Sequence, residues 1–175
     1  KTLDGGEVSN YVQNTLQIGD IVKVKGPFGN AYLRDSHKGP IIAVAGGTGL
    51  APILSIIQSS QDIKMKQPIK VYYGAQSEKD LYFLKQFEEL IKNNKNLSFV
   101  PVVIESSENK ILRSGLVTDV IINDIKNFDG YKAYLAGPPK MVEAADKILS
   151  SHGIRKVDMH SDAFYTPYDK IKEMT

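Results

Sequence analysis

The chain has 175 residues, 42% hydrophobic and 24% charged, which is typical of a globular protein with one full domain and part of another. Its 22 lysines and arginines nearly balance its 20 aspartates and glutamates, and no basic cluster favours nucleic acid as a partner. The lack of cysteine excludes a disulfide, a thiolate metal site or an iron–sulfur cluster held by this chain, and no apolar run is long enough to cross a membrane.

The first 38 residues predict the last part of an antiparallel barrel. Residues 8–16 are a candidate short helix, and residues 21–25 alternate apolar with polar side chains, as a half-exposed antiparallel strand does. A turn at residues 26–29 and a returning strand at residues 31–33 would follow. Two strands and a helical turn are too few for a stable domain. We therefore interpret residues 1–38 as the C-terminal part of a β-barrel, and the chain as a piece of a longer protein.

From residue 39 onward, predicted strands and helices alternate. Apolar β-branched runs predict strands at residues 41–45, 69–73, 98–104, 131–136 and 156–160. Apolar side chains at helical spacing predict helices at about residues 49–60, 80–92, 115–123 and 139–151. This alternation predicts an α/β domain over residues 39–165, with a five-stranded, parallel, Rossmann-like sheet covered by helices on both faces. Residues 166–175 are expected to be a C-terminal tail.

The turn after the first of these strands, residues 45–52, is the strongest candidate site. A strand, a glycine-rich turn and a helix in this order bring backbone N–H groups and a positive helix end to a place where a phosphate can bind. Gly47 and Gly49 let a ligand approach the backbone, and Thr48 adds a hydroxyl donor. Pro52 lies in the first helical turn, where its missing N–H costs nothing. An ordinary tight strand-to-helix turn is the alternative.

Four other segments occur with this turn in a fixed order. They are Gly-Glu-Val-Ser at residues 6–9, Gly-Pro-Phe-Gly at residues 26–29, Gly-Pro-Pro-Lys-Met at residues 137–141, and Asp-Ala-Phe at residues 162–164. Together they resemble the ferredoxin–NADP reductase superfamily. Tyr-Gly-Ala at residues 73–75 and Asp-Leu-Tyr at residues 80–82 resemble the NADH-dependent, FAD-containing reductase components of bacterial oxygenases. The resemblance spans nearly the whole chain and implies an FAD-binding barrel followed by a nicotinamide dinucleotide-binding domain.

The resemblance also implies which residues bind the cofactors. They are Gly6, Val8, Ser9, Gly47, Thr48, Gly49, Pro52, Gln76, Glu105, Gly137, Pro138, Met141 and Phe164. The segment around Ser9 would bind the flavin pyrophosphate at a helix start, although a plain N-cap is an equal alternative. The family's Arg-x-Tyr-Ser flavin motif is absent from this sequence. We therefore expect the chain alone to bind flavin poorly and not to turn over.

Three residues are expected closest to the reacting rings, namely Phe164, Ala136 and Thr48. The resemblance implies that Phe164 stacks on the flavin or competes with nicotinamide for its face, while a core or tail-anchoring aromatic is the alternative. Gly137 and Pro138 would form the floor beneath the nicotinamide, with a simple helix start as the alternative. Ala136 stands where many members of the superfamily have a cysteine, so we expect it to shape the pocket sterically.

The choice between NADH and NADPH depends on side chains near the adenosine 2′ position. Donors such as arginine or lysine are needed there to bind the 2′-phosphate of NADPH. Gln76 and Glu105 follow the second and third predicted strands, and a carboxylate would repel that phosphate while accepting a hydrogen bond from a free hydroxyl. Lys79 and Lys110 lie nearby and weaken this preference without removing it. NADH is therefore the favoured cofactor and NADPH the alternative.

The implied reaction passes a hydride from NADH to FAD and then electrons, one at a time, to an iron–sulfur or ferredoxin-type acceptor, such as an oxygenase system. The protein need not supply an acid or base for the hydride step, because it contributes stacking and orientation. A [2Fe–2S] cluster is expected only in a domain or partner outside this sequence. We expect no metal site, no nucleic-acid partner and a cytoplasmic location. The alternatives are a free-flavin or sugar-dehydration reductase of the same superfamily, and a non-catalytic dinucleotide-binding module.

Overall fold

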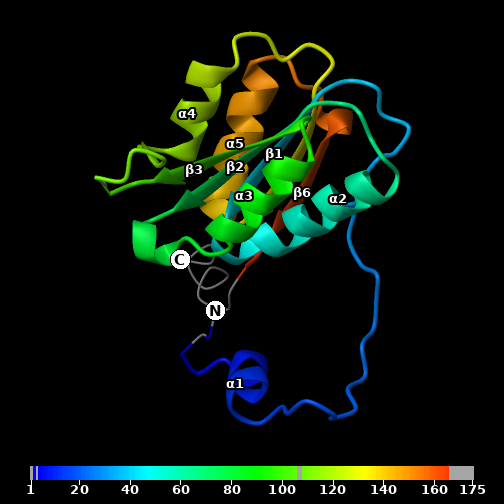
Figure 1. Cartoon of the computed structure of the whole chain (residues 1–175), viewed down its shortest axis with the longest axis vertical. Helices are drawn as coiled ribbons and strands as arrows, with labels where there is room; N and C mark the ends of the chain where they lie inside the picture. The colour runs from blue at the N-terminus through cyan, green and yellow to red at the C-terminus, as the bar shows by residue number, and fades with distance from the viewer. Residues whose placement is uncertain (1, 3, 106–107, 166–175) are drawn as a thin grey trace, which may run out of the picture.

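A parallel six-stranded sheet forms the centre of the computed structural model, which describes residues 2, 4–105 and 108–165 (Figure 1). In spatial order β4-β3-β2-β1-β5-β6, every neighbouring pair is parallel. The strands are β1 (Ile41–Gly46), β2 (Ile69–Ala75), β3 (Leu97–Val103), β4 (Arg113–Ser114), β5 (Lys132–Gly137) and β6 (Met159–Ala163). The α/β class is confirmed, while the tail predicted at residues 166–175 lies outside the described residues.

The prediction of five strands is wrong by one. The additional strand, β4, has only two residues, which are exposed and pair with the end of β3, Arg113 with Val102 and Ser114 with Val103. Because it has no apolar run, hydrophobic periodicity could not predict it. The last predicted strand is also displaced, since residues Lys156–Asp158 form a 3₁₀ turn and β6 begins after it.

Helices cover both faces of the sheet. α2 (Leu50–Asp62) and α3 (Leu84–Asn93) pack on one face, and α4 (Val117–Asp124) and α5 (Pro139–Ser151) pack on the other (Figure 1). Alternate side chains of β1 enter the two apolar clusters, so the whole strand is buried, as its unbroken apolar sequence predicts. The helix predicted to start near residue 80 begins later, because residues Glu78–Asp80 form a 3₁₀ turn with its own capping box.

The N-terminal segment differs from its prediction. The helix expected near residues 8–16 is present as α1 (Glu7–Asn14), none of whose residues is buried, and it stands apart from the sheet in Figure 1. The strands expected at residues 21–25 and 31–33 do not form, and Ile21 and Val24 are 98% and 88% exposed. A strand needs a neighbour for its backbone groups, and no described strand lies beside these residues. The described part of residues 1–38 thus shows no barrel.

The chain returns to the sheet near residue 33. The Leu33 side chain packs against the apolar cluster beneath α2, and the Arg34 backbone N–H donates a hydrogen bond of 2.8 Å to the Tyr134 hydroxyl of β5. These contacts fix the path of the chain into β1. Across the described ranges, no helix combines the length and apolar character that crossing a bilayer requires.

Candidate functional site

A hollow of about 410–480 Å³ occurs at each edge of the sheet, and the one at the carboxyl ends of the strands is lined by Gly47, one of the predicted glycines. This carboxyl-edge hollow, of about 480 Å³, lies where β1, β2, β3 and β5 end. Gly46 and Gly47 line it from the end of β1, Gly74 from β2 and Gly115 from the turn before α4. In open parallel sheets ligands bind beyond the carboxyl ends of the strands. The position of the hollow matches that rule.

Two glycines allow the turns after β1 and β5 to touch. A Cβ atom on Gly49 would stand 2.1 Å from the backbone oxygen of Ala136, and one on Gly137 would stand 2.6 Å from the backbone oxygen of Gly46. Gly137 also has a φ of +139°, which a residue with a side chain rarely adopts. The structure therefore places the turns after β1 and β5 side by side at this edge.

The turn after β1 is a single 3₁₀ turn, Gly47–Gly49, that leads directly into α2. The first N–H groups of such a turn have no partner within the helix and carry a positive partial charge. Gly47 has a φ of +51°, and a Cβ built on it would meet no atom within 4 Å. The Thr48 side chain is exposed at the same turn, and Pro52 lies within the first turn of α2. The backbone at Gly47 is thus open to a ligand in the hollow.

The first turn of α5 forms the opposite wall. Pro138, Lys140 and Met141 line the hollow there, so the N-termini of α2 and α5 both lie beside it. The Met141 sulfur packs so closely that a Cβ on Gly46 would stand 2.5 Å from it. The structure therefore brings Pro138 and Met141 together with the Gly47 turn. Two positive helix ends at one hollow favour an anionic ligand.

The two residues predicted to select the cofactor are neighbours. Gln76 follows β2 and lines the hollow, and its backbone oxygen accepts a 3.0 Å hydrogen bond from the Glu105 N–H after β3. The Glu105 side chain is exposed beside it, as are those of Lys79 and Lys110. Ser106 and Ser107, which follow Glu105, lie outside the described residues. The Glu105 carboxylate therefore lies next to a residue that lines the hollow, although Glu105 does not line it itself.

Phe164 and Ala136 take different positions near Gly137. The Phe164 N–H donates a 2.9 Å hydrogen bond to the Gly137 oxygen, which places this half-buried residue at the carboxyl edge beyond β6. It lies beside the hollow and does not line it. Ala136 is 1% exposed, and its side chain belongs to the apolar cluster beneath α2. Its contact with the site is through its carbonyl group, which touches Gly49.

The predicted flavin residues are not brought to this edge. Gly6 is the N-cap of α1, and Val8 and Ser9 lie in the first turn of that helix, apart from the sheet (Figure 1). Ser9 is therefore not an N-cap; its hydroxyl donates a 3.2 Å hydrogen bond to the Gly6 carbonyl within the helix. The structure separates these three residues from Gly47 and Gly137.

Charge in the carboxyl-edge hollow comes from two residues that sequence reasoning missed. Lys140 is the one cation among the described residues that line it, and Asp80 the one carboxylate. The Asp80 carboxylate already accepts hydrogen bonds from the Ser77 N–H and hydroxyl, at 3.2 and 2.9 Å. The Lys140 ammonium thus gives the hollow a positive side chain. Its place in the first turn after Gly-Pro-Pro was the signal in the sequence that could have identified it.

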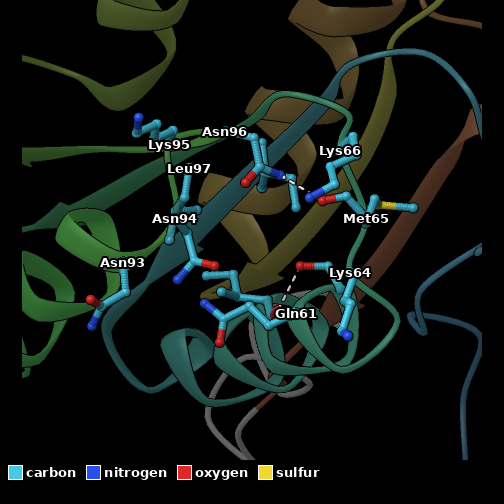
Figure 2. Close-up of a pocket in the computed structure, with 12 residues that line it drawn as sticks. Gln61, Lys64, Met65, Lys66, Asn93, Asn94, Lys95, Asn96 and Leu97 are labelled. Carbon is cyan, nitrogen blue, oxygen red and sulfur yellow. Dashed lines mark hydrogen bonds between the residues drawn. The ribbon is translucent and has the colours of Figure 1, made fainter.

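The hollow at the amino edge, of about 410 Å³, lies beside the negative C-terminal ends of helices, whereas the carboxyl-edge hollow lies beside positive N-terminal ends (Figure 2). Figure 2 shows its lining of amide and lysine side chains, among them Asn96, Lys64 and Lys95. The Asn96 amide donates to the Met65 and Gln67 carbonyls, which ties the loop before β2 to the start of β3. Both α2 and α3 end here, and lysines near helix C-termini stabilise the negative helix ends. These groups therefore have a structural explanation without a ligand.

Comparison with known proteins identifies the family of this chain. Residues 43–147 match the family described as oxidoreductase NAD-binding domain. A relative in Ralstonia sp. is 44% identical to this chain over 165 residues, covering 94% of this chain and 50% of that protein. It is named as the ferredoxin–NAD(P)+ reductase component of the naphthalene 1,2-dioxygenase/salicylate 5-hydroxylase systems. A probable flavin reductase of Vibrio harveyi is 35% identical, covering 90% of this chain and 68% of that protein.

The solved structures include a cytochrome P450 reductase of Amycolatopsis, with a TM-score of 0.84 and 29% identity, covering 94% of this chain and 50% of that one. The structural match supports the α/β architecture described above. The chain spans about half the length of the Ralstonia and Amycolatopsis proteins.

Proposed function

We propose, from the premise that this chain belongs to the oxidoreductase NAD-binding domain family of the ferredoxin–NADP reductases, that its carboxyl-edge hollow binds NADH for hydride transfer to FAD. The observation that supports this most is the pair of glycine turns, at Gly47 and Gly137, held side by side between the N-termini of α2 and α5. Two helix N-termini that converge on one hollow suit a pyrophosphate, which carries two negative charges.

The residues of the hollow fit a dinucleotide. Its volume of about 480 Å³ lies within the usual range for ligand sites, about 300–1,000 Å³. Val102, Ile104 and Leu116 give one wall apolar side chains that can pack against a base. The Lys140 ammonium and the backbone at Gly47 supply the groups that a phosphate needs. The predicted roles of Thr48, Gly49, Pro138 and Met141 remain part of this proposal.

NADH is proposed over NADPH because of the corner formed by Gln76 and Glu105. Their backbone hydrogen bond holds the two residues together beside the hollow, and we propose that the Glu105 carboxylate faces the adenosine 2′ position. Such a carboxylate disfavours the phosphate of NADPH and accepts a hydrogen bond from the hydroxyl of NADH. Lys79 and Lys110 are exposed nearby and lower the expected selectivity.

Residues of this chain would bind and orient the nicotinamide, without supplying a proton. We propose that Gly137 and Pro138 form the floor beneath its ring at the end of β5, where Pro138 lines the hollow and Phe164 lies next to Gly137. The chemistry that FAD supplies when bound is acceptance of a hydride and release of single electrons. We propose that Phe164 lies against the ring that exchanges the hydride and that Ala136, fully buried, sets the shape of the floor.

The described residues fit FAD only in part. The first turn of α1, at Gly6, Val8 and Ser9, offers N–H groups to a pyrophosphate, but no described residues enclose an isoalloxazine ring beside it. We propose that residues 1–38 belong to a flavin-binding barrel completed by the portion of the relatives that this chain does not span, and that residues 39–165 are the dinucleotide domain.

The electron acceptor is proposed to be an iron–sulfur or ferredoxin-type protein. The Ralstonia relative is named as a ferredoxin–NAD(P)+ reductase component of dioxygenase and hydroxylase systems, and a relative in Mycolicibacterium goodii is named as the reductase component of a propane 2-monooxygenase. A free flavin is the second candidate acceptor, favoured by the likeness to the probable flavin reductase of Vibrio harveyi.

Steady-state kinetics of the whole protein that contains this chain test the proposal. We expect kcat/KM for NADH to exceed that for NADPH, and electrons to reach a ferredoxin faster than they reach added free FMN. Equal or NADPH-favouring values would refute the proposed cofactor. Reduction of free FMN that exceeds reduction of every ferredoxin tried would support the second candidate acceptor instead.

A further inference from the structure

The Tyr82 side chain reaches across to the glycine turn from a different part of the chain. Its hydroxyl donates a hydrogen bond of 2.6 Å to the Gly47 carbonyl, 35 residues earlier in the sequence. Gly47 lines the carboxyl-edge hollow, while Tyr82 precedes α3 and does not line it. Tyr82 is therefore placed to act on the hollow through the backbone of Gly47.

The Tyr82 ring is held in this position by aromatic neighbours. It meets the Tyr73 ring edge-on at 5.7 Å between centroids and the Phe83 ring edge-on at 5.6 Å. Phe83 itself has a φ of +64°, a left-handed conformation that turns the chain from residue 82 into α3. Burial raises the pKa of Tyr82, so its hydroxyl keeps the proton that it donates. The hydrogen bond is thus made by a partly exposed side chain that its aromatic neighbours orient.

The hydrogen bond fixes the orientation of the peptide that joins Gly47 to Thr48. In a trans peptide the carbonyl and the following N–H point in opposite directions. Because Tyr82 and the Leu50 N–H both bind the Gly47 oxygen, the Thr48 N–H points away from them, toward the N-terminal side of the turn. That is the side on which a helix start binds a phosphate.

Without this hydrogen bond the peptide has more freedom. Gly47 has no side chain and the space around it is open, so only the hydrogen bond from the Leu50 N–H would then restrain the peptide plane on its carboxyl side. A rotated plane would present the carbonyl oxygen to the phosphate, where it would repel the ligand. The Tyr82 hydroxyl thus acts together with the Leu50 N–H to keep a donor facing the hollow.

We propose that Tyr82 is a positioning residue for dinucleotide binding, whose hydroxyl holds the Gly47 carbonyl back so that the Thr48 N–H faces the pyrophosphate. The inference rests on the proposed function of the carboxyl-edge hollow. It assigns Tyr82 an effect on affinity and none on the hydride step, because the residue touches the turn and not the floor at Gly137.

The test compares Tyr82→Phe with Tyr131→Phe in the 175-residue chain. Each variant loses one hydroxyl, but Tyr131 lies at the amino end of β5, beside Phe128, away from Gly47. Calorimetric titration with NAD+ should show a Kd raised about 3- to 10-fold by Tyr82→Phe, the usual effect of losing one hydrogen bond, and unchanged by Tyr131→Phe. The Thr48 amide resonance of the free protein should move in Tyr82→Phe alone.

The outcomes separate this inference from the one on which it rests. Wild-type and Tyr82→Phe chains that bind NAD+ equally well would overturn the role of Tyr82 and leave the proposed function intact. A lower melting temperature with unchanged Kd would show a merely structural role and overturn it too. A wild-type chain that does not bind NAD+ would refute the proposed function itself. In the whole flavoprotein, a raised KM with unchanged kcat supports the inference, and a lowered kcat contradicts it.

Discussion

Replacing Gly47 by alanine separates the binding role of the glycine turn from its effect on stability. Gly47 has a φ of +51°, and a Cβ there would touch no atom within 4 Å, so the substitution adds backbone strain but no clash. Gly130, in the turn before β5, has a φ of +73° and equally open surroundings, but lies at the amino edge and lines neither the amino-edge nor the carboxyl-edge hollow. Gly130→Ala is therefore a matched control.

Both variants should lose similar stability. A left-handed conformation costs a residue with a Cβ about 1–2 kcal/mol, which lowers the melting temperature of a chain of this size by about 2–8 °C. The two should differ in affinity, because the new methyl group of Gly47→Ala stands in the hollow where the phosphate approaches the backbone. Loss of one backbone hydrogen bond to a charged group costs about 1.5–3 kcal/mol, or about 10- to 150-fold in Kd.

The assay combines thermal unfolding with calorimetric titration of NAD+ for the wild type and both variants. We expect both variants to melt at lower temperatures than the wild type, by similar amounts. Only Gly47→Ala should show a raised Kd for NAD+. A Gly47→Ala chain that binds NAD+ as tightly as the Gly130→Ala chain would refute the assignment of the Gly47 turn as the phosphate site.

Three further predictions concern charged side chains. Glu105→Arg should shift the ratio of kcat/KM values toward NADPH, since it replaces a repulsive carboxylate with a phosphate donor; an unchanged ratio would contradict the proposed corner. Lys140→Gln should raise the Kd for NAD+ several-fold and weaken its dependence on salt, whereas Lys147→Gln, at the far end of α5, should change neither. A hydrogen bond from the largely buried Lys132 holds the pKa of the Asp158 carboxyl below its usual value. The pair therefore stabilises the fold above about pH 4, and this stabilisation is lost as the pH falls through the lowered pKa. Asp158→Asn should therefore cost about 3 kcal/mol at neutral pH and flatten the acid limb of the unfolding free energy, which urea titrations over pH 2–7 would measure.

The sequence predicted the elements that have a strong apolar period. β1 and β5 are buried on both faces, so the apolar runs at residues 41–45 and 133–136 were sufficient to predict strands of a parallel sheet. The adjacency of the Gly49 and Gly137 turns was also predictable, because only glycine permits backbones to approach that closely after neighbouring strands.

Other features depend on pairing that no local pattern reports. β4 exists because two exposed residues, Arg113 and Ser114, meet the end of β3, and neither residue type indicates a strand. Residues 21–25 have the alternation of a strand but stay unpaired in the described structure, because alternation specifies a face and does not supply a partner. The hydrogen bond from Tyr82 to Gly47 joins residues that only the folded sheet brings together.

The central claim is that a nicotinamide dinucleotide binds at the carboxyl edge of the sheet, and an NMR titration tests it most directly. NAD+ is added to the ¹⁵N-labelled chain, and the amide shifts of the two edges are compared. The account predicts saturable shifts at Gly47, Gly74 and Gly115, and little change at Asn94 and Asn96, which line the hollow at the amino edge. Shifts concentrated at Asn94 and Asn96, or no saturable shift at Gly47, would contradict it.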